Sequence, residues 1–436
     1  MRTFSVRVSA LFVFQFIVFS STYAIKGSDL DINGYIGFEV GQMARSQYQG
    51  VDYAHLWLGS TVGNINFKAV PSENLTVLLG MEGRMWFNSF PPEALRNQHF
   101  VYTSYTDFYL HQAQGILSLI KGNSISLECA AGIMPYKYNP EARNLGEYLF
   151  RTGTYPAYII NNFDFPRARL SGARVSFNYT GGAINAGIDV FALTEREMRP
   201  FHDLSLAAVA NVGISKAVTL GAGVELAHIW AVEDTMTTSN RDDNKYVNGT
   251  DTGYYTFRGT KLMARVTIDP LFSIRENLRD VVGNSGKIYG EIAILGLKNY
   301  PAYANNKYGY DDLKDKMPLM FGINLPGWKL LDICALEFEY FGCKYPDSYD
   351  QVIYAGYPRQ ADRFIYDDST VYQHDSWKWS VYLKKNIARN FGVIFQIGRD
   401  HLRYEALGAF IENADFGAAL VKPNQYAWRS KFEFTF

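Results

Sequence analysis

The last eleven residues of the chain, "YAWRSKFEFTF", alternate in side-chain character up to the final position. Tyr426, Trp428, Phe432, Phe434 and Phe436 share one parity, while charged and polar residues dominate the other. Successive side chains of a β-strand point to opposite faces, so this pattern predicts a strand with an aromatic face and a polar face. Strands of soluble proteins favour Val and Ile as much as aromatics, and chain ends are usually polar and frayed. Lipid against one face and water against the other account better for this ending.

Similar alternation recurs through the chain, in the stretches 31–40, 75–87, 124–133, 183–192, 218–230 and 376–385. The alternation is poor in 53–70 and 107–120, where we expect β-bulges. Short segments rich in Gly, Pro and Asn predict tight turns at 179–183, 214–218, 324–328 and 386–390. Long polar connections alternate with these turns, at 89–103, 139–165, 233–252, 298–316, 344–373 and 404–424. Together they predict an all-β fold, a transmembrane antiparallel up-and-down barrel of about 16 strands.

The first 24 residues have the organisation of a secretory signal peptide. Arg2 and Arg7 precede an uncharged apolar run over 9–20, and the small residues Thr22 and Ala24 follow it. The alternative, an N-terminal membrane helix, needs about 20 apolar residues. We therefore expect a signal peptide over 1–24 and a barrel over 25–436.

Composition argues against several other classes of protein. Outside the signal peptide, 40 basic residues face 43 acidic ones, so no basic excess points to nucleic acid as a partner. The seven histidines fall in no HExxH motif, and the chain has no Gly-rich phosphate loop and no GxSxG elbow. We expect no enzyme, no cofactor and no metal site. Catalytic groups drawn from distant strands, as some barrel enzymes use, are the alternative.

At the level of pattern, the whole chain after the signal peptide resembles the Gram-negative outer-membrane porin superfamily. The resemblance implies a place in the bacterial outer membrane, in contact with lipid and lipopolysaccharide, and possible homotrimers. It also implies that the outer-membrane assembly machinery reads the C-terminal aromatics, namely Trp428, Phe432, Phe434 and Phe436. The expected function is a water-filled channel for passive diffusion of ions and small hydrophilic solutes, sugars included. The alternatives are a surface adhesin or receptor barrel with a closed lumen and binding loops, and a soluble periplasmic all-β protein.

The polar parity of the predicted strands carries charges that would line the lumen. They are Glu39, Glu82, Arg84, Glu128, Arg174, Asp189, Glu225, Lys261, Arg265, Glu291, Glu337, Glu339, Lys378, Lys384, Arg429, Lys431 and Glu433. One interpretation is that neighbouring strands pair these charges into ladders that stiffen the wall. The other is that they tune which ions pass. Because both signs occur, the sequence predicts weak ion selectivity at most.

The third long connection, 139–165, is the candidate constriction. Asn139 suits a helix cap and Pro140 suits the first helical position, so we expect a short helix over 140–150. The resemblance to porins implies that this loop folds into the barrel. The constriction residues would then be Arg143, Glu147 and Arg151, with Arg167 and Arg169 on the following strand. The segment lacks the acidic, glycine-rich sequence of general porins, and a lid over the mouth or an exposed loop are the alternatives.

Three further features leave two interpretations open. Tyrosines crowd 299–312 and 344–373, where they would bind sugar rings or order the long loops. Acidic pairs would hold divalent cations or be solvated loop charges, namely Asp242/Asp243, Asp311/Asp312 and Asp367/Asp368. Cys334 and Cys343 would be paired or free.

Overall fold

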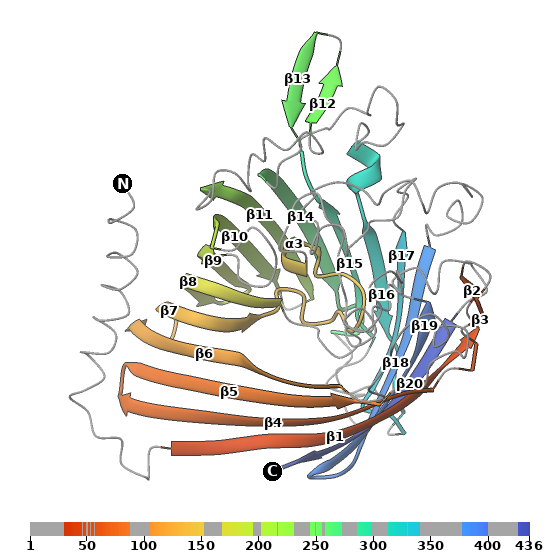
Figure 1. The fold of residues 1–436 in the computed structure, drawn as a ribbon. Coiled ribbons are helices and arrows are strands. Elements are labelled where there is room, and N and C mark those ends of the chain that lie inside the picture. The colour runs from red at the N-terminus through yellow and green to blue at the C-terminus, as the bar shows by residue number, and fades with distance from the viewer. Residues whose placement is uncertain are drawn as a thin grey trace.

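Sixteen strands close into one antiparallel barrel in the computed structural model of the chain (Figure 1). The structure describes residues 30–45, 47–48, 51–52, 54–55, 57–87, 105–151, 168–194, 202–215, 217–230, 245–248, 250–254, 258–272, 286–297, 313–328, 330–340, 377–399 and 426–436. Each barrel strand pairs with the barrel strands before and after it in sequence, and the first pairs with the last. The predicted all-β antiparallel up-and-down barrel of about 16 strands is therefore confirmed, and 16 strands is a number found in porins.

The barrel strands are β1 (Leu30–Arg45), β4 (Trp57–Ser72), β5 (Leu75–Trp86), β6 (Tyr105–Lys121), β7 (Ile125–Tyr136), β8 (Ala168–Gly181), β9 (Ile184–Thr194), β10 (Leu204–Ile214), β11 (Val218–Trp230), β14 (Gly259–Ile268), β15 (Ile288–Ile294), β16 (Leu319–Asn324), β17 (Ile333–Tyr340), β18 (Trp377–Ala388), β19 (Phe391–Arg399) and β20 (Tyr426–Thr435). Two small hairpins stand apart from the barrel: β2 (Gln47–Tyr48) with β3 (Val51–Asp52), and β12 (Lys245–Asn248) with β13 (Asp251–Tyr254). The short helices are α3 (Tyr148–Arg151) and the 3-10 turn η3 (Leu313–Lys316). No helix among the described residues is long and apolar enough to span a membrane.

The two ends of the barrel sheet meet where β1 pairs with β20. Phe38 lies opposite Phe432, and Glu39 lies opposite Lys431. The backbone of Phe436 continues this seam, because its N–H donates to the Gly34 carbonyl at 3.0 Å and its carbonyl accepts from the Gly34 N–H at 3.1 Å. A Cβ atom at Gly34 would lie 2.2 Å from the backbone oxygen of β4 that faces it, so only glycine fits this closure.

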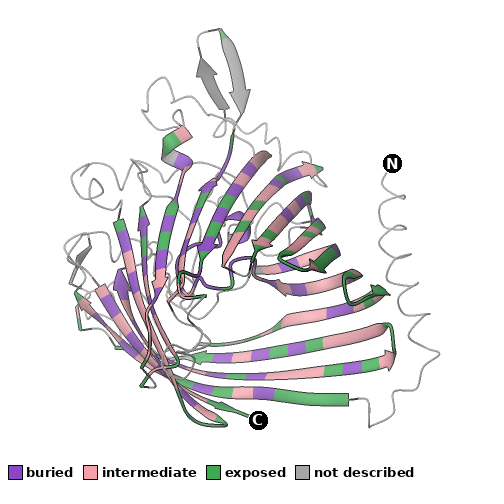
Figure 2. Ribbon diagram, turned by 180° about the vertical axis from the view of Figure 1, so that it is seen from behind, coloured by how far each residue is buried: buried purple, intermediate pink, exposed green. Residues whose placement is uncertain are grey.

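Burial alternates along the strands, as Figure 2 shows by its changing bands. On β1 Phe38 is exposed and Glu39 is buried, and on β11 Leu226 is exposed and Glu225 is buried. A strand of a water-soluble protein buries its apolar face instead. The barrel therefore presents its apolar side chains outward and its charged side chains inward.

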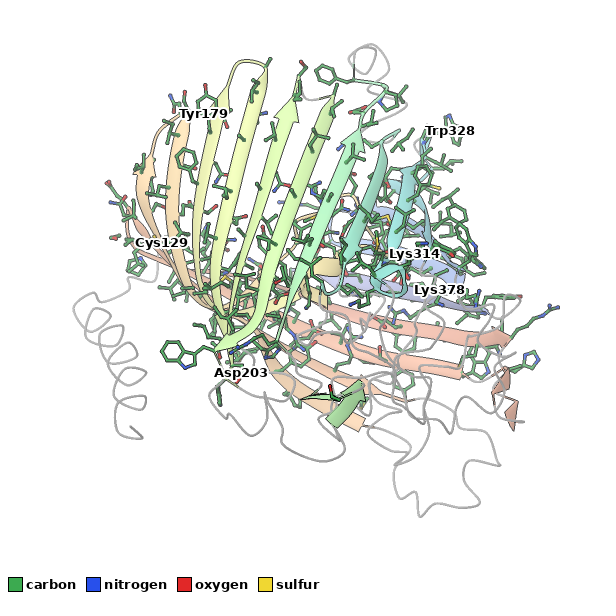
Figure 3. All side chains as sticks on the ribbon, turned by 90° about the horizontal axis from the view of Figure 1, so that it is seen from above. Cys129, Tyr179, Asp203, Lys314, Trp328 and Lys378 are labelled. Atoms are coloured by element: carbon green, nitrogen blue, oxygen red, sulfur yellow. The ribbon has the colours of Figure 1, made fainter. Side chains whose placement is uncertain are left out.

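Exposed aromatic residues lie at both ends of the barrel, although some, such as Phe38 on β1, lie nearer its middle. At the end with the long connections they are Trp57, Phe108, Trp230, Tyr340 and Trp377; at the end with the short turns they are Tyr179, Phe272, Trp328, Phe434 and Phe436. Figure 3 shows Tyr179 and Trp328 at one end of the strands and Asp203 at the other. Ten residue steps separate the exposed Trp377 and Ile387 on β18. At about 3.3 Å per residue and a tilt of about 40°, that is about 25 Å along the barrel axis, the height of a membrane-facing band.

Irregular pairing occurs where the sequence alternates poorly. Between β5 and β6, Gly80 faces Gln112 but Met81 faces Leu110, so His111 is an extra residue. A second register shift in β6 lies at 118–120, and one in β4 lies at 69–72. The expected bulges are therefore confirmed. The predicted tight turns near 180, 215 and 388 are also confirmed, whereas the connection near 326 is longer and extends over 325–332.

Candidate pore lining

All seventeen charged residues predicted to line the lumen lie on the parity opposite to the exposed apolar residues of their strands. Twelve of them are buried: Glu39, Glu82, Arg84, Glu225, Lys261, Arg265, Glu291, Glu337, Glu339, Lys378, Arg429 and Lys431. The other five are partly exposed: Glu128, Arg174, Asp189, Lys384 and Glu433. The inward face is thus a charged wall, and its buried charges need partners.

One ladder of charges crosses β5, β1 and β20. The Arg84 guanidinium lies 3.5 Å from the Glu82 carboxylate and 3.9 Å from that of Glu39. Arg429 approaches Glu39 from the other side at 3.3 Å. The Tyr109 hydroxyl on β6 donates to Glu82 at 2.5 Å, which extends the network to a fourth strand. Of these ion pairs, that of Glu39 with Arg429 joins two adjacent strands, as the ladder interpretation expects.

Two smaller groups of ion pairs occupy other parts of the wall. Lys261 on β14 lies 2.9 Å from the carboxylate of Glu225, its register partner on β11. On β18 and β20, Lys384 and Lys431 share the carboxylate of Glu433, at 3.8 and 3.2 Å. Each carboxylate is therefore compensated locally, as burial in a low dielectric requires.

Residues 137–151, here called the internal segment, follow β7 and lie inside the barrel, where α3 contacts β8, β11, β14 and β15 (Figure 1). One wall carboxylate, Glu337 on β17, holds three successive backbone groups of this segment. The N–H groups of Arg143, Asn144 and Leu145 donate to Glu337 at 2.5, 2.8 and 2.9 Å. The Tyr289 hydroxyl on β15 donates to the same carboxylate at 2.9 Å. Glu337 thus accepts four hydrogen bonds from described residues and fastens 143–145 to the wall.

A second wall carboxylate, Glu291 on β15, holds the next turn of the segment. It accepts hydrogen bonds from the N–H groups of Glu147 and Tyr148 at 3.0 and 2.8 Å, and from the Tyr138 hydroxyl at 2.6 Å. The Asn139 amide donates to it at 3.0 Å. Burial raises the pKa of Tyr138, and the carboxylates of Glu291 and Glu147 raise it further, so Tyr138 keeps its proton and remains a donor.

The expected helix over 140–150 is mostly absent, because α3 begins only at Tyr148. The backbone of Gly146 and Glu147 is left-handed, with φ of 82° and 63°. The backbone N–H groups of 143–145 and 147–148 bond to wall carboxylates rather than to carbonyls one turn earlier. The prediction of a helix before Tyr148 was therefore wrong, because wall carboxylates bind the backbone N–H groups that a helix would use.

Apolar packing supports the polar anchors of the segment. Phe150 of α3 packs edge-on against Phe191 of β9 and Tyr136 of β7, with ring centroids 5.5 and 5.7 Å apart. Leu145 and Leu149 of the segment are fully buried in the same cluster. The inside of the barrel therefore contains a hydrophobic core between the segment and one side of the wall.

The five predicted constriction residues have different positions. Arg143 lies on the anchored segment and is half-buried, while the carboxylate of Glu147 turns back and accepts the N–H groups of Tyr138 and Asn139. Arg169, on β8, places its guanidinium 4.5 Å from the centre of the Tyr109 ring. Arg167, the side chain of Arg151 and residues 152–165 lie outside the described residues, as do residues 1–24 and the three acidic pairs. The inward folding of the whole loop 139–165 therefore stays a prediction.

Sequence reasoning missed two groups of buried polar residues. Tyr138 and Tyr148, which bind wall carboxylates, resemble any other loop tyrosine in sequence; their only signal is their closeness to Asn139 and Glu147. The fully buried pair Asp203 and His228, with Nδ1 3.2 Å from the carboxylate, lies at the long-connection end of β10 and β11. No pattern in the sequence marks that pair.

The described residues contain no group of three or more His, Cys, Asp and Glu side chains that is suited to a metal ion. Cys129 and Cys334 are free thiols. Cys343 lies outside the described part of the chain, so the alternatives for Cys334 and Cys343 stay as the sequence leaves them. Both tyrosine-rich stretches, 299–312 and 344–373, also lie wholly outside it.

No family model matches the sequence, and no curated protein matches it. Among solved structures, a mutant of the Rhodopseudomonas blastica porin aligns with 93% of this chain and 100% of its own, with a TM-score of 0.41 and 9% identity. A triple mutant of the same porin aligns over the same shares, with a TM-score of 0.40 and 8% identity. Similarity at this level adds nothing to the pairing of the strands, which by itself defines a closed antiparallel barrel of sixteen strands.

Proposed function

We propose that this chain forms a passive, water-filled channel in the bacterial outer membrane, through which ions and small hydrophilic solutes diffuse. The observation that carries the proposal is the reversed polarity of the closed barrel, with charged side chains inward and apolar ones outward. Exposed aromatics at both ends, with an outward apolar face about 25 Å tall on β18 from Trp377 to Ile387, match the girdles and apolar band of barrels that span a membrane. No chemical step is part of this function.

The internal segment would act as the size filter of the channel. It crosses the lumen from β7 and is bonded to β15 and β17, so it reduces the open cross-section to the part of the barrel it leaves free. Solutes would pass beside Arg143 and the wall opposite. Sugars are within this solute class, and no described residue favours them over other small solutes.

Export and assembly follow from the same proposal. We infer that residues 1–24 direct export, and that the outer-membrane assembly machinery reads Trp428, Phe432, Phe434 and Phe436. These four aromatics lie on the outward parity of β20 and its end. Replacing Phe436 by Ala should lower the yield of assembled barrel in outer-membrane fractions, while Phe272→Ala, an exposed aromatic outside β20, should not.

The test of the channel is the current through the refolded mature protein in a planar bilayer. We expect stable single-channel steps of about a nanosiemens, as a lumen wider than a single file of ions gives. A correctly folded barrel that produces no steps would contradict the channel. The adhesin or receptor barrel would then explain the fold better.

A further inference from the structure

We infer that Glu141 holds the tip of the internal segment, here residues 140–142, against the wall and thereby sets the width of the passage. This inference rests on the proposed channel function and identifies a positioning residue of its size filter. It follows from the path that the segment takes between its bonds to β15, β16 and β17.

The internal segment forms a loop whose two arms meet at Glu291 of β15. The first arm is bonded to this carboxylate by the Tyr138 hydroxyl and the Asn139 amide, and the second arm by the N–H groups of Glu147 and Tyr148. The Glu147 carboxylate also accepts the N–H groups of Tyr138 and Asn139, which joins the two arms directly. The residues between 139 and 147 therefore leave the level of Glu291 and return to it.

Glu141 bonds this loop to the short-turn end of the barrel. Its carboxylate lies 2.5 Å from the Lys287 ammonium and accepts a 2.7 Å hydrogen bond from the Asn324 amide. Lys287 directly precedes β15 and Asn324 ends β16, and the Asn324 N–H donates to the Lys287 carbonyl at 2.9 Å. Lys287 is four residues from Glu291, about 13 Å along an extended strand at about 3.3 Å per residue. Glu141 therefore fastens the loop far from the point where its arms meet.

The residues on either side of Glu141 have no comparable bond to the wall among the described contacts. Pro140 lacks an N–H group. The N–H of Ala142 donates to the Asn139 carbonyl at 3.2 Å, and its carbonyl accepts from the Lys137 ammonium, so both bonds stay within the segment. The bonds of the wall to backbone N–H groups begin again only at residue 143, where Glu337 accepts them. The Glu141 side chain is therefore what holds 140–142 to the wall.

The exposed edge of the segment lies beside Glu141. Pro140 is exposed and Arg143 is half-buried, whereas Glu141 and Ala142 between them are buried. Because the segment lies inside the barrel, Pro140 and Arg143 face the space that solutes would use. A tip released from Lys287 and Asn324 would move this edge within that space. Glu141 therefore determines where the edge lies and how much of the lumen stays open.

The test is single-channel recording of the refolded mature protein in a planar bilayer, with neutral polyethylene glycols of graded mass as probes of width. We expect one conductance level in the wild type and several in Glu141→Ala, with a changed mass limit for polymer entry. Lys287→Glu should act like Glu141→Ala, because two carboxylates then face each other. The double exchange Glu141→Lys with Lys287→Glu should restore one level. A general loss of stability would not be reversed by this exchange.

Asp332→Ala is the matched control. Asp332 also lies at the short-turn end and contacts a lysine, Lys385 at 3.5 Å, but Lys385 has the outward parity of β18. This variant should keep one conductance level and the polymer limit of the wild type. If Glu141→Ala fails to fold, the comparison of Lys287→Glu with the double exchange decides the matter.

A second measurement does not depend on conduction. Ala142→Cys places a thiol at a position that is 1% exposed, in a chain whose three native cysteines are replaced by Ser. Adding Glu141→Ala should make this thiol react about tenfold faster with a water-soluble maleimide, because the tip opens more often. Wild-type conductance, polymer limit and protection in Glu141→Ala would overturn the role of Glu141 and leave the channel function standing. A folded wild-type barrel without channels would overturn the channel function, and the labelling would then decide whether Glu141 holds the tip.

Discussion

The Tyr148 hydroxyl donates a 2.8 Å hydrogen bond to the Glu339 carboxylate, which lies 191 residues later in the chain. Glu339 is on β17, on the side of the barrel opposite β7, where the internal segment begins. Both side chains are buried. The bond therefore connects the short helix α3 to β17 across the inside of the barrel. It belongs to a set of hydrogen bonds that wall carboxylates accept from donor groups of the internal segment.

Tyr148→Phe should loosen this connection without changing the shape of the side chain. Loss of a hydrogen bond to a buried carboxylate typically costs about 1.5 to 3 kcal/mol of unfolding free energy. Urea unfolding in detergent or lipid, followed by the mobility of folded and unfolded barrel on gels, measures it. Tyr179→Phe, on the exposed outward face, is the control and should have no measurable effect. If Tyr148→Phe and Tyr179→Phe had equal unfolding free energies, the hydrogen bond to Glu339 would make no measurable contribution to stability.

Glu337→Gln should release residues 143–145 from the wall. The amide keeps one acceptor oxygen but presents an NH2 group to backbone N–H groups that now donate to a carboxylate. We expect larger current fluctuations in single channels and a loss of about 2 to 4 kcal/mol of stability. Glu128→Gln is the matched control, because Glu128 is inward and partly exposed and accepts a long hydrogen bond of 3.4 Å from the Ser118 hydroxyl. Quiet channels in Glu337→Gln would argue against a carboxylate anchor.

These two anchors also show where sequence reasoning ends. The alternation that places Phe38 outward and Glu39 inward is local, so period two was enough to predict the strands and their parity. The backbone of Asn144 is bonded to Glu337, 193 residues away, and no local pattern contains that contact. The predicted helix before Tyr148 failed for the same reason. Capping residues favour a local helix, but they carry no information about distant wall carboxylates that bind the backbone N–H groups instead.

Gly146→Ala should destabilise the internal segment more than it destabilises the barrel. Gly146 has φ of 82°, which an L-residue adopts only with strain, and a Cβ atom there would lie 2.4 Å from the end of the Met320 side chain. Met320 is flexible, so the backbone conformation is the main cause, and we expect a cost of about 1 to 2 kcal/mol. Protease cleavage within 139–151 of the folded protein measures it. Gly63→Ala has open space around the new methyl group and should resist cleavage like the wild type.

The anchor at Tyr138 should make the barrel sensitive to alkaline pH. The pKa of Tyr138 is raised in the folded state, by burial first and then by Glu291 and Glu147. A group whose pKa is higher when folded contributes stability that is complete below its unfolded pKa of about 10 and declines as the pH rises above it. The decline is at most about 1.4 kcal/mol per pH unit. Unfolding free energies of the wild type and Tyr138→Phe, measured from pH 7 to 11.5, should therefore differ by a constant amount below pH 9. Above pH 10 the difference should shrink, because only the wild type has this proton to lose. A difference that stays constant to pH 11.5 would show that Tyr138 does not hold its proton for Glu291.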